Sequence, residues 1–115
     1  MFDKNSLGLQ RRLAKKDYIF DENNANFVNN DYNRVMFAYV QNHFNDLRRS
    51  RGYVFLNEVL VYLGLRPTAI GQIAGWTMMP IEIKIVQTKV RDGKEVEYFL
   101  EIENQGLIVF DVMGD

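Results

Sequence analysis

The sequence predicts an α+β domain made of four helices followed by a three-stranded antiparallel β-meander. Up to about residue 76 the apolar residues recur with the spacing of helices, and after Pro80 they alternate with polar residues, as they do in strands. The length of 115 residues, with 47% hydrophobic and 25% charged residues, is typical of one soluble globular domain. We therefore expect a single domain over residues 1–115, with a helical part at 1–76 and the meander at 80–113.

Two helices are predicted on either side of an asparagine-rich segment. Residues 5–16 can form a helix with leucines toward one side, and residues 21–31 (DENNANFVNND) predict a loop. Residues 31–49 have apolar side chains at positions i, i+3, i+4 and i+7 throughout, so one face of this second helix is expected to be buried. That predicted face consists of Tyr32, Val35, Met36, Tyr39, Val40, His43, Phe44 and Leu47. Gly52 is expected to end the helix.

A third and a fourth helix are predicted in the middle of the chain. The segment YVFLNEVLVYLGL contains about two helical turns and is expected to end at Gly64. Pro67 fits the first turn of a new helix, which we expect to run to about Gly75 or Trp76. Gly71 and Gly75 lie inside that predicted helix, where each glycine costs roughly 1 kcal/mol relative to alanine. We explain them by close packing against another helix or strand.

Three strands are predicted after Pro80. IEIKIVQTKV and EVEYFLEIE are separated by RDGK, in which Asp-Gly is a strong signal for a two-residue hairpin turn. This turn sets the register of the two strands. The expected pairs are Arg91 with Lys94, Ile85 with Leu100, Ile83 with Ile102, Lys84 with Glu101 and Val86 with Phe99. The NQG segment predicts another turn, and LIVFDV, residues 107–112, predicts the third strand.

Several classes of protein lack support in the sequence. The chain has no cysteine, which excludes disulfides and thiol nucleophiles. It has no P-loop, dinucleotide-binding glycine pattern, nucleophile elbow or HExxH motif, so we expect no catalytic residue, no metal and no cofactor. His43, the only histidine, lies on the predicted buried face, where we expect it to be packed. There is no secretory signal or membrane span, so we expect a cytoplasmic protein.

Acidic residues gather in the predicted sheet. These are Glu95, Glu97, Glu101, Glu103, Asp111 and Asp115. They alternate with apolar residues, as the solvated face of a half-exposed sheet does. A small hydrolase or metal-dependent enzyme that uses these carboxylates is the competing hypothesis.

The central block of the chain resembles a known family. Residues 51–76 contain an aromatic-rich YVFLNEV helix, an LGL turn, Thr68 and a final GQ..GW pattern. This block is similar to that of small uncharacterised proteins encoded in phages and prophages of Gram-positive bacteria. The TMMP segment after Trp76 departs from the pattern. The resemblance implies a phage context and a β-rich C-terminal part, and it implies no catalytic residue.

The leading functional hypothesis is a non-enzymatic protein that binds another protein, or a second copy of itself, in the bacterial cytoplasm. Trp76, Met78 and Met79 are the candidate interaction residues, because these large apolar side chains lie between the predicted helices and sheet without an assigned partner. If they are buried instead, they belong to the core.

The alternative hypothesis is a DNA-binding regulator. Residues 56–76 have the spacing of a helix-turn-helix, with Arg66, Thr68 and Gln72 available for contact with DNA. Arg48, Arg49 and Arg51 form a candidate phosphate-binding group. The few base-reading side chains and the net charge of -1 disfavour this hypothesis.

Overall fold

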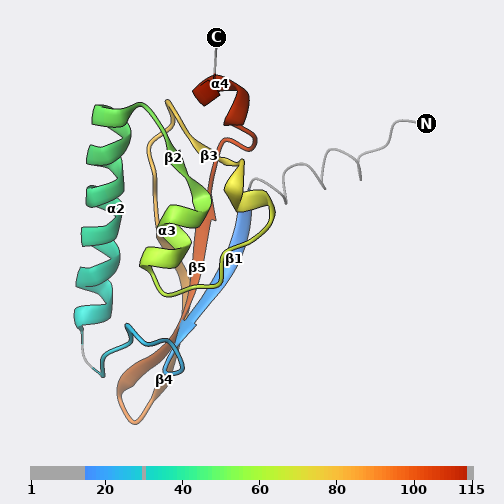
Figure 1. Cartoon of the computed structure of the whole chain (residues 1–115). Coiled ribbons are helices and arrows are strands. Elements are labelled where there is room, and N and C mark those ends of the chain that lie inside the picture. The colour runs from blue at the N-terminus through green and yellow to red at the C-terminus, as the bar shows by residue number, and fades with distance from the viewer. Residues whose placement is uncertain (1–14, 30, 114–115) are drawn as a thin grey trace.

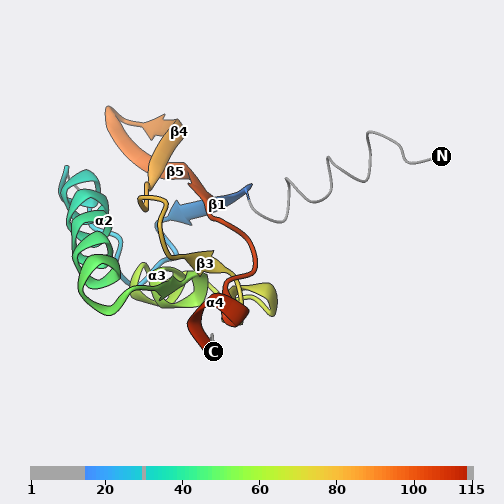
Figure 2. The same cartoon turned by 90° about the horizontal axis from the view of Figure 1, so that it is seen from above.

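The computed structural model describes residues 15–29 and 31–113, which form an α+β fold. A three-stranded antiparallel sheet has the strand order β1-β5-β4, and a small second sheet pairs β2 with β3. Helices α2 and α3 lie on one face of the larger sheet, and no described helix or strand covers its other face (Figures 1 and 2). The elements are β1 Lys15–Asp21, α2 Tyr32–Arg51, β2 Val54–Phe55, α3 Leu56–Tyr62, the 3-10 turn η1 Ile70–Gln72, β3 Gly75–Trp76, β4 Lys84–Arg91, β5 Lys94–Glu103 and α4 Val109–Met113.

The prediction of four helices followed by a meander is wrong. The described residues contain three α-helices, and two of the predicted elements have a different structure. The predicted helix at residues 5–16 lies mostly outside the described residues, but its last two positions begin strand β1. In β1, Tyr18 and Phe20 point into the core while Ile19 points to solvent, which is the alternation of a strand with one buried face.

Helix α2 is confirmed, but its predicted buried face is only half correct: Val40 and Phe44 are buried, and Met36 and Leu47 pack against the core. Gly52 ends the helix in the left-handed region with a φ of 97°. The residues of α2 that are buried are Asn33, Phe37, Val40, Phe44 and Asn45. Tyr32, Val35, Tyr39 and His43 are exposed instead. Apolar side chains cover more than one face of this helix, so periodicity alone could not select the face that packs.

Helix α3 is confirmed, and polar side chains fix both of its ends. At its start, the Glu58 carboxylate accepts a hydrogen bond of 2.8 Å from the Phe55 backbone N–H. At its end, the side-chain amides of Asn24 and Asn26 donate to the carbonyl oxygens of Leu63 and Tyr62, at 3.1 and 3.2 Å. The asparagine-rich loop therefore caps the C-terminus of α3.

The fourth predicted helix, residues 67–76, is wrong. Only a 3-10 turn forms at Ile70–Gln72, and Gly75–Trp76 is strand β3, paired with β2. The Asn57 side chain organises this segment: it donates to the Thr68 carbonyl at 2.8 Å and accepts from the Thr68 N–H at 2.9 Å. The hydrogen bond to the Thr68 carbonyl occupies an acceptor that a helix starting at Pro67 would have used in its first turn.

The hairpin of β4 and β5 is confirmed, with two irregularities. The pairs Arg91 with Lys94, Ile85 with Leu100 and Lys84 with Glu101 are as predicted. Between them the register shifts at Lys89/Val90 and again at Ile85/Gln87, and the second shift restores the original register. Phe99 is therefore paired with Gln87 and not with Val86.

The predicted third strand, residues 107–112, is also wrong. Leu107 makes one isolated bridge to Ala74, and the chain then forms helix α4. The third strand of the large sheet is β1, which pairs with β5 from Lys15↔Glu103 to Asp21↔Glu97. The edge of β5 that a meander would have used is thus occupied by the N-terminal strand.

The core lies between the large sheet and helices α2 and α3. Four aromatic rings meet in it, from β1, the following loop, α2 and β5: Phe20, Phe27, Phe37 and Tyr98. Trp76, Leu100 and Ile102 extend this cluster. The core therefore joins the first described strand to the last one.

Candidate protein-binding surface

The predicted interaction residues are divided between the core and the surface. Trp76 is fully buried, and its Nε1–H donates to the Glu103 carbonyl oxygen at 2.9 Å. Met79 is half-buried against the core, whereas Met78 is 85% exposed. The Gln105 side-chain oxygen accepts hydrogen bonds from three successive backbone N–H groups of this turn, at 2.6 to 2.9 Å. The turn is therefore held firmly, but it presents a single large apolar side chain and not the three-residue patch that the interaction hypothesis requires.

The residues of the predicted DNA-binding alternative are not brought together on a reading helix. Arg66 and Gln72 are exposed in a loop and a 3-10 turn, and the backbone of Thr68 is bonded to Asn57. Because residues 67–76 form no helix, they lack the recognition helix that a helix-turn-helix requires.

The three arginines at the end of α2 each have protein partners. Arg48 donates to the carbonyl oxygens of Thr77 and Met78, both at 3.4 Å. Arg49 pairs with Asp46 at 2.8 Å. Arg51 pairs with Glu58 at 2.6 Å, and its guanidinium lies 4.2 Å from the centre of the Tyr53 ring. These contacts connect α2 to its own last turn, to α3 and to the loop before β4.

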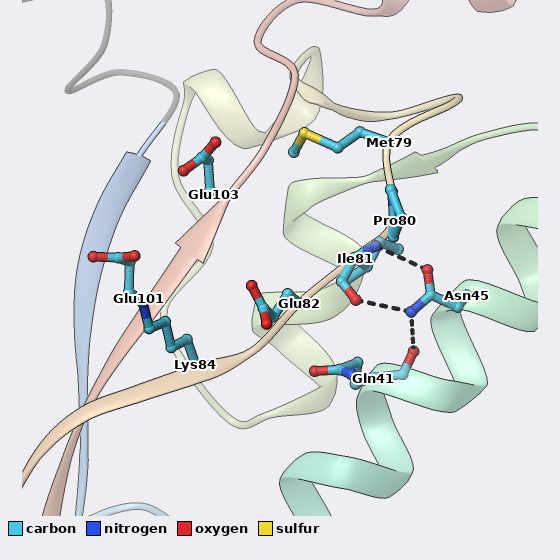
Figure 3. A pocket seen from close by; sticks show the side chains of 9 residues that line it. All are labelled: Gln41, Asn45, Met79, Pro80, Ile81, Glu82, Lys84, Glu101 and Glu103. Carbon is cyan, nitrogen blue, oxygen red and sulfur yellow. Dashed lines mark hydrogen bonds between the residues drawn. The ribbon is translucent and has the colours of Figure 1, made fainter.

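An acidic groove of about 580 Å³ opens beside the start of β4 (Figure 3). It forms because residues 81–83 do not pair with β5 and are bonded to side chains of α2 instead. The Asn45 side chain donates to the Ile81 carbonyl and accepts from the Ile81 N–H, both at 2.8 Å, and the Gln41 side chain accepts from the Ile83 N–H at 2.9 Å. Carboxylates of Glu82, Glu101 and Glu103 line the groove beside Lys84. In the described part of the chain, no group of three or more His, Cys, Asp or Glu side chains is arranged to hold a metal ion.

Another ion pair holds the opposite end of α2 to the hairpin. Arg34 makes two hydrogen bonds to the Glu95 carboxylate, at 2.8 and 2.6 Å. The hydrogen bond from Arg34 lowers the pKa of Glu95, so this carboxylate stays charged to a more acidic pH than an isolated glutamate does. Lys89 lies 3.6 Å from Glu97 on the same hairpin. Two acids of the sheet are thus structural partners of basic residues.

An aromatic surface lies along the outer side of α2. We call it the tyrosine face, and it consists of Tyr32, Val35, Tyr39 and His43 of α2 and Tyr62 of α3. Tyr32, Val35 and Tyr39 are 68%, 59% and 57% exposed, although all three were predicted to be buried. A solvent-facing helix surface is normally charged or polar, so large exposed apolar side chains are unusual on this surface of α2.

Three side chains of the tyrosine face, Tyr39, His43 and Tyr62, are in mutual contact. The His43 ring stacks on Tyr39, with ring centres 6.1 Å apart, and lies 5.4 Å from the Tyr62 ring. A hydrogen bond with Tyr39 raises the pKa of Tyr62, so the two phenols are in direct contact. His43 is therefore an exposed member of an aromatic stack and not the buried residue that was predicted.

One signal in the sequence could have identified this surface. From Val35 to Asn45 the helix has no Asp, Glu, Lys or Arg. Eleven residues span about three turns, so any exposed side of α2 in this stretch must be uncharged. We interpreted the apolar residues as a single buried stripe because periodicity cannot distinguish a core contact from a contact with a partner.

The chain is thus an α+β protein whose described part presents an aromatic helix surface and an acidic groove. It belongs to a family of unknown function, DUF6353, whose family model matches residues 3–112. No curated protein and no solved structure matches it. The resemblance to a family of uncharacterised proteins is confirmed at this coarser level. Among the described helices, none is long and apolar enough to cross a membrane.

Proposed function

We propose that this chain is a non-enzymatic protein that binds a protein partner through the tyrosine face. The exposure of Tyr32, Val35 and Tyr39 on α2, with Val35 and Tyr39 inside the stretch that has no charged residue, is the observation on which the proposal rests. Tyrosine is enriched at protein interfaces because its ring supplies a large apolar contact while its hydroxyl keeps a hydrogen-bonding partner. Met78 is a secondary contact at most, because Trp76 beside it is buried.

The acidic groove provides weaker support for a function. Its carboxylates line an open groove, and Lys84 is the register partner of Glu101 on the neighbouring strand. Removing water from the apolar area of the tyrosine face lowers the free energy of binding. Removing water from carboxylates raises it, so the tyrosine face is the better binding surface.

The first test compares capture of proteins by the immobilised chain and by two variants. Val35→Glu with Tyr39→Arg places two charges in the tyrosine face, and Val90→Arg places one on the exposed hairpin tip as the matched control. Wild type and control are expected to retain the same polypeptide from a lysate of the producing cells, and the face variant is expected to lose it. If all three retain identical polypeptides, the tyrosine face is not the binding surface.

The biological setting is a further part of this proposal. We infer a phage or prophage protein that acts in the cytoplasm of a bacterial host, because residues 51–76 are similar to proteins from that source. The genes on either side provide the test: neighbours for capsid, tail, replication or repressor proteins are expected. A setting among ordinary metabolic genes would contradict the inference.

A further inference from the structure

We propose that the partner of the tyrosine face is a second copy of this chain, with the two α2 helices packed antiparallel across a twofold axis. The inference rests on the proposed function of the face and adds the identity and orientation of the partner. A twofold contact uses the same surface on both copies, so one self-complementary patch is sufficient.

The spacing of the face fits a neighbouring helix. Tyr32, Val35, Tyr39 and His43 follow one another at i, i+3, i+7 and i+11, which is the spacing of a seam along which a second helix packs. The seam is about 16 Å long. An antiparallel partner centred on it would bring Tyr32 of one copy to His43 of the other, and Val35 and Tyr39 to the middle of the contact.

The charges at the ends of α2 favour the antiparallel orientation. Asp31 precedes the first turn, whereas Arg48, Arg49 and Arg51 lie in the last turn. Because the seam ends at His43, the arginine end of each helix would extend beyond the start of the other, with Arg48 about one helical turn past the level of Asp31. A parallel pair would bring the arginine ends and the like ends of the helix dipoles together.

The exposed area is close to what a specific dimer needs. A half-exposed aromatic side chain offers roughly 100 Å² of contact area, so the four aromatic residues of the face, together with the smaller Val35, supply on the order of 500 Å² per copy. Two copies would then bury on the order of 1,000 Å², which is the lower limit for a specific interface.

The β4 edge of the large sheet is a poorer surface for self-association than the tyrosine face. The strand β4 lies at the edge and has Lys84, Lys89 and Arg91 along it. Its ladder with β5 contains the two register shifts described above. Charged side chains and bulges are the features that prevent edge strands from pairing with another chain.

Sedimentation equilibrium of the whole chain, from micromolar to millimolar concentration, tests the dimer. Wild type and Val90→Arg are expected to dimerise with the same dissociation constant. Tyr39→Arg is expected to raise that constant at least about tenfold, because a charge at the centre of the seam would have to be desolvated. Circular dichroism melting of each variant checks that it is folded.

Cysteine cross-linking tests the orientation, since the natural chain has no cysteine. Tyr32→Cys and His43→Cys place thiols at opposite ends of the seam. A disulfide requires Cα atoms within about 7 Å, so an antiparallel dimer should cross-link only when the two variants are mixed. A parallel dimer would instead cross-link within each variant alone, and that result would overturn the proposed orientation.

The outcomes separate this inference from the proposed function. A chain that stays monomeric at millimolar concentration and forms no mixed cross-link overturns the dimer. If such a monomer still captures a polypeptide that the Val35→Glu, Tyr39→Arg variant loses, the proposed function stands with a different protein as partner. If it captures none, both proposals fail.

Discussion

Gly75 lies where strand β3 passes directly against the backbone of β2. A Cβ at this position would overlap the Val54 carbonyl oxygen and come within 2.8 Å of Phe55 Cα. Gly71 is similarly enclosed by the Asn57 side chain that holds the 65–72 loop. The expectation that these glycines permit close packing is confirmed, although the element that contains them is not a helix.

Gly75→Ala is expected to lower the free energy of unfolding by about 1–3 kcal/mol, because backbone atoms cannot move aside as a flexible side chain can. Chemical denaturation monitored by Trp76 fluorescence measures the change. Gln72→Ala, an exposed position in the same segment, serves as the control and should change stability by less than about 0.5 kcal/mol. Equal midpoints for Gly75→Ala and wild type would show that β2 and β3 separate at little cost.

At the scale of elements, side chains of α2 make the hydrogen bonds that a neighbouring strand would make to the segment before β4. Residues 81–83 approach the large sheet but bond to the side chains of Asn45 and Gln41. Asn45 is buried and supplies one donor and one acceptor to Ile81, as a neighbouring strand would. This arrangement positions Met79 against the core and opens the acidic groove between residues 79–84 and β5.

Asn45→Ala should lower the free energy of unfolding by about 2–4 kcal/mol, since it leaves both backbone groups of the buried Ile81 without their partner. Gln41→Ala removes a single hydrogen bond to Ile83 and should cost roughly half as much. Urea denaturation of both variants gives the comparison. If Gln41→Ala proves the more damaging change, Asn45 is not the main anchor of this segment.

The elements that were predicted correctly are those whose signals are local. Helix α2 has its apolar spacing and terminal glycine, and the β4–β5 hairpin has its Asp-Gly turn. The segments predicted wrongly, residues 67–76 and 107–112, depend on partners far away in the sequence, such as Asn57 and Ala74. Strand β1 has the alternation Tyr18, Ile19, Phe20, but this pattern is too short to identify its pairing partner in advance.

At the scale of the whole molecule, core contacts connect β1, near the start of the described chain, with the β4–β5 hairpin. The Phe20 ring contacts Phe37 edge-on at a centre-to-centre distance of 5.0 Å, and Phe37 contacts Tyr98 in the same way at 5.3 Å. This contact series connects β1, α2 and β5. Loss of one ring should therefore destabilise the whole fold and not just one element.

Phe20→Ala is expected to lower the free energy of unfolding by about 3–5 kcal/mol, through lost burial and the cavity that remains. Ile19→Ala provides a matched control one residue away, because Ile19 is 53% exposed on the opposite face of β1. Its cost should be below about 1 kcal/mol. Thermal and chemical denaturation of the two variants test the register of β1: similar losses would indicate that the strand does not pair with β5 as described.

The sequence by itself determined the α+β class, the second and third helices and the hairpin, because these features arise from spacing and turn chemistry within a few residues. Only the tertiary structure decided that the third strand of the large sheet is β1, that residues 67–76 wrap around Asn57, and which side of α2 is buried. The free energy of those choices comes from contacts between residues far apart in the chain. Local periodicity carries no information about such contacts, so only the tertiary structure identifies the tyrosine face as exposed.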